Sequence, residues 1–274
     1  MKRHRALLGA LVLGAAVVAL AFLLLPVAAI FLRVPPGKLL HQLSSPVVTD
    51  ALIVSAKTSV IAQALIIVFG TPLAYLLATR RFRGRALAIT LVELPLVLPP
   101  AVAGIGLLAL FGRSGLLGTS IPFTQTAVVL AVAFVSSPLY IRQAIVAFEA
   151  VDPNLVAASR TLGAGPGRTF FRVELPLARG GLAAGEALAF ARGLGEFGAT
   201  IMFAGSLQGV TQTLPLAIYQ EFDIQPDGFT TALAMSGVLV LLSAVLLLTL
   251  RIALSWQRSP SNRSLSLFGI SSSA

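Results

Sequence analysis

The sequence contains no cysteine and only two histidines, His4 and His41, and just 11% of its 274 residues are charged. Without cysteine the chain has no disulfide framework, no thiolate zinc site and no cysteine nucleophile. Two histidines are too few for a histidine-rich metal site. Soluble domains carry about a quarter charged residues, whereas 57% of this chain is hydrophobic and its mean hydropathy is +0.92. The composition therefore indicates a membrane protein.

Six apolar segments take up most of the chain, each near the roughly 20 residues that a helix needs to cross a bilayer. They cover residues 7–32, 52–78, 87–111, 124–147, 182–204 and 229–253. Backbone groups find no water in lipid, so such segments must be helical, and the alternating pattern of membrane β-strands is absent. We predict an all-α, polytopic membrane protein with about six transmembrane helices.

The first segment follows a basic run, residues 2–5, as a secretion signal does. A cleavable signal has an apolar core of about 7–15 residues, whereas the uncharged run here extends from residue 6 to residue 32, so we predict a retained first helix. We divide the chain into residues 1–44 (first helix and outer loop), 45–255 (transmembrane domain) and 256–274, a Ser-rich tail predicted to be disordered.

The basic residues predict the orientation. The net charge is +10, but the basic residues form no stripe that would bind nucleic acid: Lys57 and Arg192 fall within apolar segments, and the others lie between or at the ends of these segments. With the N-terminus inside, three lie on the outer side, Arg33, Lys38 and Arg113, and fifteen on the inner side: Lys2, Arg3, Arg5, Arg80, Arg81, Arg83, Arg85, Arg142, Arg160, Arg168, Arg172, Arg179, Arg251, Arg258 and Arg263. Basic loops stay in the cytoplasm. We therefore predict a multi-pass protein of the inner membrane with both termini cytoplasmic.

Two glycine-rich strings resemble nucleotide-binding motifs but lack the context that those motifs need. Residues 193–198 (GLGEFG) have the G-x-G-x-x-G spacing but lie in an apolar segment with no strand before them. Close helix packing by small residues explains this string better, as it does residues 181–185 (GLAAG). In residues 163–169 (GAGPGRT), a phosphate-binding loop would need Gly and Lys where the chain has Leu162 and Arg168. We predict that this chain binds no nucleotide, cofactor or metal.

Segment 87–111 contains Pro95, Pro99 and Pro100, and proline removes a backbone donor and kinks a helix. In a membrane such kinks are tolerated where protein or a water-filled cavity satisfies the freed carbonyls. The segment is therefore either a broken helix that lines a pathway or an irregular packing helix.

Two charges lie inside segment 182–204. Arg192 and Glu196 are four residues apart, so on a helix they share one face and can pair. Ionisable residues at membrane depth are functional candidates, and a structural ion pair that holds helices together is the equal alternative.

A polar island, residues 141–181, interrupts the apolar pattern with five arginines and three acids. Asp152 and Pro153 are typical of a helix start, as N-cap and first helical residue. The helix should run to about Leu162 and stop at Gly163. A second short helix is expected from about residue 167 to residues 175–176. The island is thus predicted to be a helix–turn–helix element parallel to the membrane, with its turn exposed.

The island resembles the EAA motif of ABC importer permeases, EAA-x3-G-x9-I-x-LP. Residues 157–159 occupy the EAA positions. Gly163 follows six residues after Ala157, and Val173 follows ten residues after Gly163. The Leu-Pro pair of the motif is at residues 175–176. The chain departs from the motif at Ala157, where the family has Glu, and at positions 159 and 173. In the family this loop, here 148–181, forms a coupling helix that docks in a groove of a separate ATPase subunit. The resemblance assigns coupling to Ala157, Ala158, Ser159, Leu162, Gly163, Ala164, Leu175 and Pro176.

Residues 94–104 (LPLVLPPAVAG) and 194–201 (LGEFGATI) are similar to the molybdate/sulfate branch of that family, and the resemblance covers roughly residues 45–255. Residues 98–100 (LPP) followed by 111–113 (FGR) favour molybdate, and sulfate and tungstate permeases are the alternatives. The resemblance implies a type I importer fold, a homodimer, two cytoplasmic ATPase subunits that hold ATP and Mg²⁺, and an extracytoplasmic oxyanion-binding protein. The subunit itself is then not an enzyme.

By the same resemblance the substrate passes between the two copies of the permease, which open alternately to the two sides. Hydroxyls suit an oxyanion, whereas Glu196 would repel a dianion unless Arg192 neutralises it, so that pair is predicted to gate or to pack. The chain shows no internal repeat, which argues against a secondary transporter. The residues predicted to line or gate the pathway are Pro95, Pro99, Pro100, Ser136, Ser137, Arg192, Glu196 and Thr200.

Overall fold

The computed structural model describes residues 2–35, 37, 44–224 and 228–257. Over these ranges the regular elements are all helices, which confirms the predicted fold class. Four helices contain a stretch that is long and apolar enough to cross a membrane, namely α1 (Lys2–Arg33), α3 (Pro46–Thr79), α6 (Gln125–Glu149) and α12 (Gly228–Gln257). Most of the tail predicted to be disordered, residues 258–274, lies outside the described residues.

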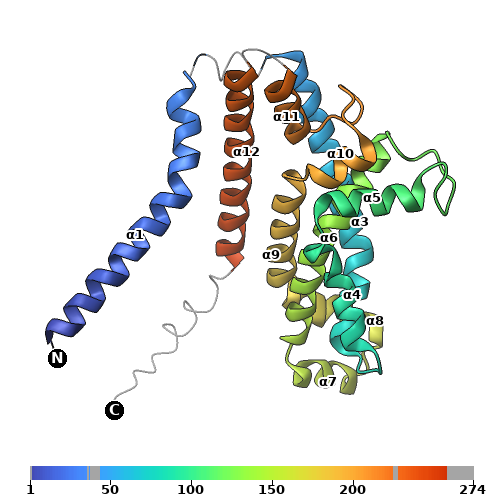
Figure 1. Ribbon diagram of the computed structural model, residues 1–274. Helices are drawn as coiled ribbons and strands as arrows, with labels where there is room; N and C mark the ends of the chain where they lie inside the picture. Colours follow the sequence, from blue (N-terminus) through green and yellow to red (C-terminus); the bar gives the residue numbers. More distant parts are fainter. Residues whose placement is uncertain (1, 36, 38–43, 225–227, 258–274) are drawn as a thin grey trace.

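The centre of the bundle is formed by α3, α6 and α9 (Leu175–Leu194), with α6 packed along its length against both α3 and α9 (Figure 1). Alanines on the contact faces, such as Ala74, Ala144 and Ala189, are fully buried. A Cβ added at Gly181 would lie 2.5 Å from the Ala147 Cβ, and one at Gly185 would lie 3.2 Å from the Tyr140 carbonyl oxygen. Small residues thus let α9 approach α6 closely, as predicted for this glycine pair.

The proline-rich segment is divided into two helices, α4 (Arg85–Val97) and α5 (Pro100–Phe111), which meet at an angle of 112°. Leu98 and Pro99 between them are extended, and Pro100 opens α5 at a position where its missing N–H costs nothing. The predicted break is confirmed. On α4, Glu93 lies 3.5 Å from the guanidinium of Arg142 on α6.

Segment 182–204 is also divided, although it was predicted as one span. Helix α9 ends at Leu194 and the short helix α10 (Gly198–Ala204) begins after a three-residue break. Helix α9 carries Arg179, Glu186 and Arg192, and these charges keep it outside the set of long apolar helices. The described part of the chain therefore holds four such helices, or five if α4 and α5 form one bent span, and the predicted number of six is not confirmed.

The elements fall toward two ends of the molecule. The start of α1 and the segment around α7 (Pro153–Thr161) lie toward one end, whereas α10 and α11 (Leu214–Ile224) lie toward the other (Figure 1). Helix α11 lies between α10 and α12 in the chain. Helix α1 stands apart from the bundle beside α12 (Figure 1), and no residue of its long apolar stretch is buried. The N-terminus and the polar island thus share one end, as the charge distribution predicts.

Candidate functional site

The polar island folds as α7 (Pro153–Thr161), a turn, the short helix α8 (Pro166–Thr169) and the π-helical turn η1 (Phe170–Glu174), and we call residues 150–174 the α7 loop. The Asp152 carboxylate accepts a hydrogen bond from the Asn154 N–H at 2.8 Å, and Pro153 is the first helical residue. This confirms the predicted helix start. Figure 1 shows α7 lying across the end of the bundle.

The end of α7 is fixed by its own backbone. The Ala164 N–H donates to the Ser159 carbonyl at 3.1 Å, and the Gly163 N–H donates to the Arg160 carbonyl at 3.0 Å. These two bonds form a Schellman motif, which needs a left-handed residue between them. Gly163 has φ +81°, a conformation that glycine adopts at no steric cost. The predicted stop at Gly163 is therefore confirmed, with a physical cause.

The turn faces solvent. Leu162 is 88% exposed, and a Cβ added at Gly163 would meet no atom within 4 Å. On α7 itself Ala157 and Ala158 are exposed and no residue is buried, whereas Ala164 is half-buried. Helix α7 buries none of its residues and is capped at both ends. It is therefore a rigid element on the surface, where a partner could reach it.

The second arm of the loop differs from its prediction. A short helix was expected to end at residues 175–176, but α8 runs through η1 directly into α9. The Leu175 N–H donates to the Phe170 carbonyl, five residues back, so the backbone makes one wide π turn before Pro176. A proline inside an α-helix removes a donor and clashes with the preceding turn, and the π turn accommodates it without ending the helix. Leu175 is half-buried and Pro176 exposed.

Side chains of three helices hold the α7 loop on the bundle. The Ser159 and Thr169 hydroxyls lie 3.1 Å apart and join α7 to α8. The ring of Phe170 packs edge-on against Tyr75 of α3, with centroids 4.8 Å apart, and Tyr75 packs in the same way on Phe148 of α6. Aromatic pairs of this kind each contribute about 0.5–1.5 kcal/mol beyond their burial. The loop is therefore joined rigidly to α3 and α6.

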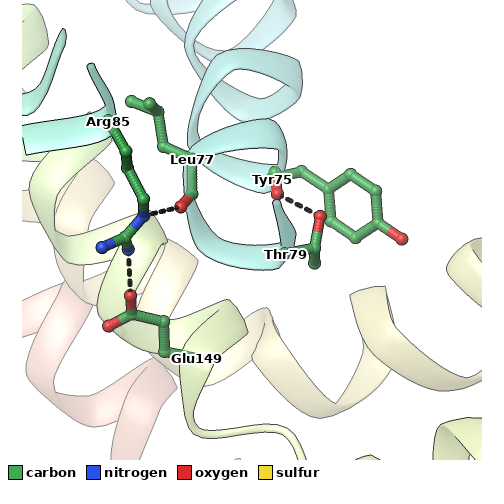
Figure 2. A network of polar contacts seen from close by, with 5 residues as sticks. All are labelled: Tyr75, Leu77, Thr79, Arg85 and Glu149. Atoms are coloured by element: carbon green, nitrogen blue, oxygen red, sulfur yellow. Dashed lines mark hydrogen bonds and ion pairs between the residues drawn. The ribbon is translucent and has the colours of Figure 1, made fainter. Parts of the chain in front are cut away.

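The same end of α3 is tied to α4 and α6 by Arg85 (Figure 2). Its Nε–H donates to the Leu77 carbonyl at 2.6 Å, and its guanidinium pairs with Glu149 at the end of α6. The Tyr75 ring points away from this network, on the other side of α3 (Figure 2). Two separate sets of contacts thus brace the ends of α3 and α6 where the α7 loop begins.

A second polar site lies at the break between α9 and α10. The Glu196 side chain is 1% exposed, and its Oε2 lies 2.7 Å from Nη1 of Arg192, which is 34% exposed. Its Oε1 accepts a hydrogen bond from the Ala199 N–H at 2.7 Å. A carboxylate at a helix N-terminus satisfies free N–H groups and the helix dipole. Glu196 thus joins the last turn of α9 to the first turn of α10.

The break packs tightly against its neighbours through glycine. A Cβ added at Gly193 would lie 2.9 Å from Val132 Cγ1, and one at Gly198 would lie 2.7 Å from Pro100 Cβ. These approaches confirm the packing interpretation of residues 193–198. They also bring Pro100, at the start of α5, against the start of α10.

The structure brings together only some of the residues predicted to line a pathway. Ser136 is fully buried and donates to the Val132 carbonyl at 2.5 Å, and Thr200 is fully buried with no partner for its hydroxyl within the described chain. Ser137 instead lines an apolar groove of 450 Å³ between α3, α5 and α6. Pro95 lies inside α4, and Pro99 and Pro100 are exposed at the bend. The eight residues do not form one site in this single chain.

The structure buries polar atoms of three residues that the sequence analysis did not single out as functional candidates. Gln63 on α3 is 4% exposed, and neither atom of its amide has a hydrogen-bond partner within the described chain. Glu174 is 6% exposed and accepts a hydrogen bond from the Tyr75 hydroxyl at 2.8 Å. Glu186 Oε2 on α9 is buried without a partner. Gln63 and Glu186 interrupt apolar segments, and Glu174 directly precedes the Leu-Pro pair. A polar residue within an apolar segment is a sign of function that can be read from the sequence.

The described chain is thus a bundle of apolar helices with one rigid polar loop at its end. The family of binding-protein-dependent transport system inner membrane components matches residues 70–256 of the chain. The chain belongs to this family.

Two proteins similar to this chain over most of its length are molybdenum transport permeases. The molybdenum transport system permease protein ModB of Mycobacterium tuberculosis is 42% identical over 240 residues, which cover 85% of this chain and 90% of that protein. ModB of Escherichia coli K12 is 41% identical over 207 residues, 73% of this chain and 90% of that protein.

Two solved structures share the fold. A bacterial ABC transporter that imports the acidic polysaccharide alginate matches with a TM-score of 0.70 at 15% identity, over 94% of this chain and 98% of that one. The MetNI methionine ABC transporter in an inward-facing form matches with a TM-score of 0.61 at 21% identity, over 76% of this chain and 95% of that one. The chain therefore has the fold of an ABC importer permease.

Proposed function

We propose that this chain is the permease subunit of an ATP-driven molybdate importer, working as a homodimer with two cytoplasmic ATPase subunits and an extracytoplasmic binding protein. The observation that carries the proposal is the identity of 41–42% to molybdenum permeases over most of the chain. ATP and Mg²⁺ would be held by the ATPase, so this chain supplies the pathway and the docking surface and carries out no catalysis.

The α7 loop is the part of the chain suited to receive the ATPase. It exposes Leu162 and Gly163 at a capped, rigid turn. Its other end continues without interruption into α9, and its aromatic contacts reach α3 and α6. A displacement of the loop by the ATPase is therefore passed to the three central helices as a mechanical movement. The α7 end, with the N-terminus, would face the cytoplasm.

The α9–α10 break is suited to change shape during alternating access. Glu196 is bonded to both helices, so a rotation of α10 relative to α9 must alter its bonds to Arg192 or Ala199. Because its carboxylate is buried and already paired, we assign Arg192 and Glu196 to gating or packing and not to oxyanion binding. A dianion is better served by hydroxyl and N–H donors that hold it weakly enough to release it.

The test is an oxyanion panel on the assembled transporter. The chain is reconstituted in liposomes with its ATPase and binding protein, and ATP hydrolysis is measured with molybdate, tungstate or sulfate at equal concentrations. Molybdate should stimulate hydrolysis most strongly and should accumulate inside the liposomes. Stimulation by sulfate alone would assign the chain to sulfate transport, and uptake that needs no ATPase would refute an ABC permease.

A further inference from the structure

A cavity of 620 Å³ opens between α7 and the ends of α3 and α6. Ala157 and Arg160 of α7 line one side, Tyr75 of α3 and Arg80 just after α3 another, and Glu174 of η1 is also part of the lining. The cavity thus lies behind the exposed turn, where the α7 loop meets the bundle.

Glu174 is the buried charge of this cavity. Glu174 is 6% exposed, and its Oε2 accepts one hydrogen bond, from the Tyr75 hydroxyl at 2.8 Å. No ion pair joins it to any residue that the structure describes. A carboxylate offers about four acceptor positions, and a buried charge is costly unless a cation and further donors accompany it. The remaining acceptor capacity of Glu174 is therefore open to a group that enters the cavity.

The other charges of the cavity do not fill this role. Glu149 is itself paired with Arg85. Arg80 and Arg160 are exposed, and neither lies within ion-pair distance of Glu174. Both are long side chains in solvent, where their charge is screened.

We propose that this cavity receives a basic side chain of the ATPase subunit and that the Glu174 carboxylate pairs with it. The inference rests on the proposed function, because it requires an ATPase docked on the α7 loop. Position 157, where an acid was expected, lines the same cavity but is alanine. Glu174 therefore supplies the carboxylate of this cavity from η1 instead of from α7.

The pairing would connect the ATPase to the bundle by a second route. Glu174 lies next to Leu175, the first residue of α9, and is bonded to Tyr75 near the end of α3. A basic side chain that pulls on Glu174 thus acts on α3 and α9 directly, beside the contact made at the tip of the loop.

The decisive experiment measures how tightly the ATPase subunit binds the reconstituted full-length permease. Glu174→Gln keeps the shape and the bond to Tyr75 but removes the charge, and it should weaken binding at least about tenfold, since one partner of a buried ion pair is lost. Adding Ala157→Glu to Glu174→Gln returns a carboxylate to the same cavity and should restore binding in part. Glu93→Gln is the control, a carboxylate outside the cavity that is already paired with Arg142, and should bind as the wild type does.

Three outcomes overturn the inference. Unchanged binding in Glu174→Gln would remove the pairing, and failure of Ala157→Glu to restore binding would reduce Glu174 to a structural support of Tyr75. A loss in Arg160→Gln equal to that in Glu174→Gln would make Arg160 the partner. A wild-type chain that binds no ATPase subunit refutes the proposed function itself, which separates that failure from these.

Discussion

The α7 loop and the α9–α10 break both interrupt the run of long apolar helices, and they do so by opposite means. The α7 helix buries none of its residues and depends on local bonds, a carboxylate cap at Asp152 and a left-handed glycine at its end. The break buries Glu196 and depends on contacts with other helices, through Gly193, Gly198 and Pro100. This difference suits the roles that we propose for the two regions. The α7 loop, as a docking element, has to be rigid before the ATPase binds. The α9–α10 break, as a joint that moves, has to be stable in more than one packing arrangement.

Replacing Glu196 tests the joint and should have the largest effect. Glu196→Ala removes the bonds of a buried carboxylate to Arg192 and to the Ala199 N–H at the start of α10, and a hydrogen bond to a charged group contributes about 1.5–3 kcal/mol. The melting temperature of the purified chain in detergent should fall clearly. Glu196→Gln, which keeps the shape, should fall less and leave oxyanion selectivity unchanged. Altered selectivity with continued transport would contradict a gating or packing role.

The packing of α5 on α10 can be tested with two glycines of one helix. A Cβ at Gly104 would lie 2.6 Å from the Ala199 carbonyl oxygen and 2.7 Å from Met202 Cβ, whereas one at Gly106 would meet nothing within 4 Å. Gly104→Val should destabilise the fold by about 1–3 kcal/mol through overpacking, and Gly106→Val should not. Equal melting temperatures for the two variants would show that α10 does not pack here.

The cap of α7 should have the smallest effect on stability. Asp152→Ala removes the acceptor of the Asn154 N–H, and a lost N-cap costs about 1 kcal/mol. Because α7 is peripheral, the loss should appear as faster hydrogen exchange of α7 amides with an unchanged melting temperature. Asp152→Asn, which can still cap, is the control. If exchange is the same in all three proteins, the loop is held by its tertiary contacts and not by its cap.

The same contrast explains which parts of the structure the sequence could predict. The start and stop of α7 were predictable because Asp152, Pro153 and Gly163 act on neighbouring backbone groups. The continuation of η1 into α9 was not, because the Phe170–Tyr75 contact and the bond from Tyr75 to Glu174 join residues about a hundred positions apart. Pro176 locally favours an end, and tertiary packing overrides it.

The α9–α10 break was visible only in part. The i, i+4 spacing of Arg192 and Glu196 predicted their ion pair, which the structure contains at 2.7 Å. The spacing could not reveal that Glu196 also caps α10, since that bond forms only when the helix is broken. The hydropathy of segment 182–204 suggested one span because it averages over the break. The number of spans remains a prediction for the same reason.

The most direct test of the account is molybdate uptake by liposomes that contain the Gly163→Leu permease with its ATPase and binding protein. A Cβ added at Gly163 meets no atom within 4 Å, although the φ of +81° there costs about 1–2 kcal/mol for a residue with a side chain. The variant should insert and fold, as should its control Gly180→Leu, at a position where an added Cβ also meets no atom within 4 Å. Gly163→Leu should lose molybdate uptake coupled to ATP hydrolysis, whereas Gly180→Leu should keep it. Unchanged uptake in Gly163→Leu would contradict the assignment of the α7 loop as the coupling element.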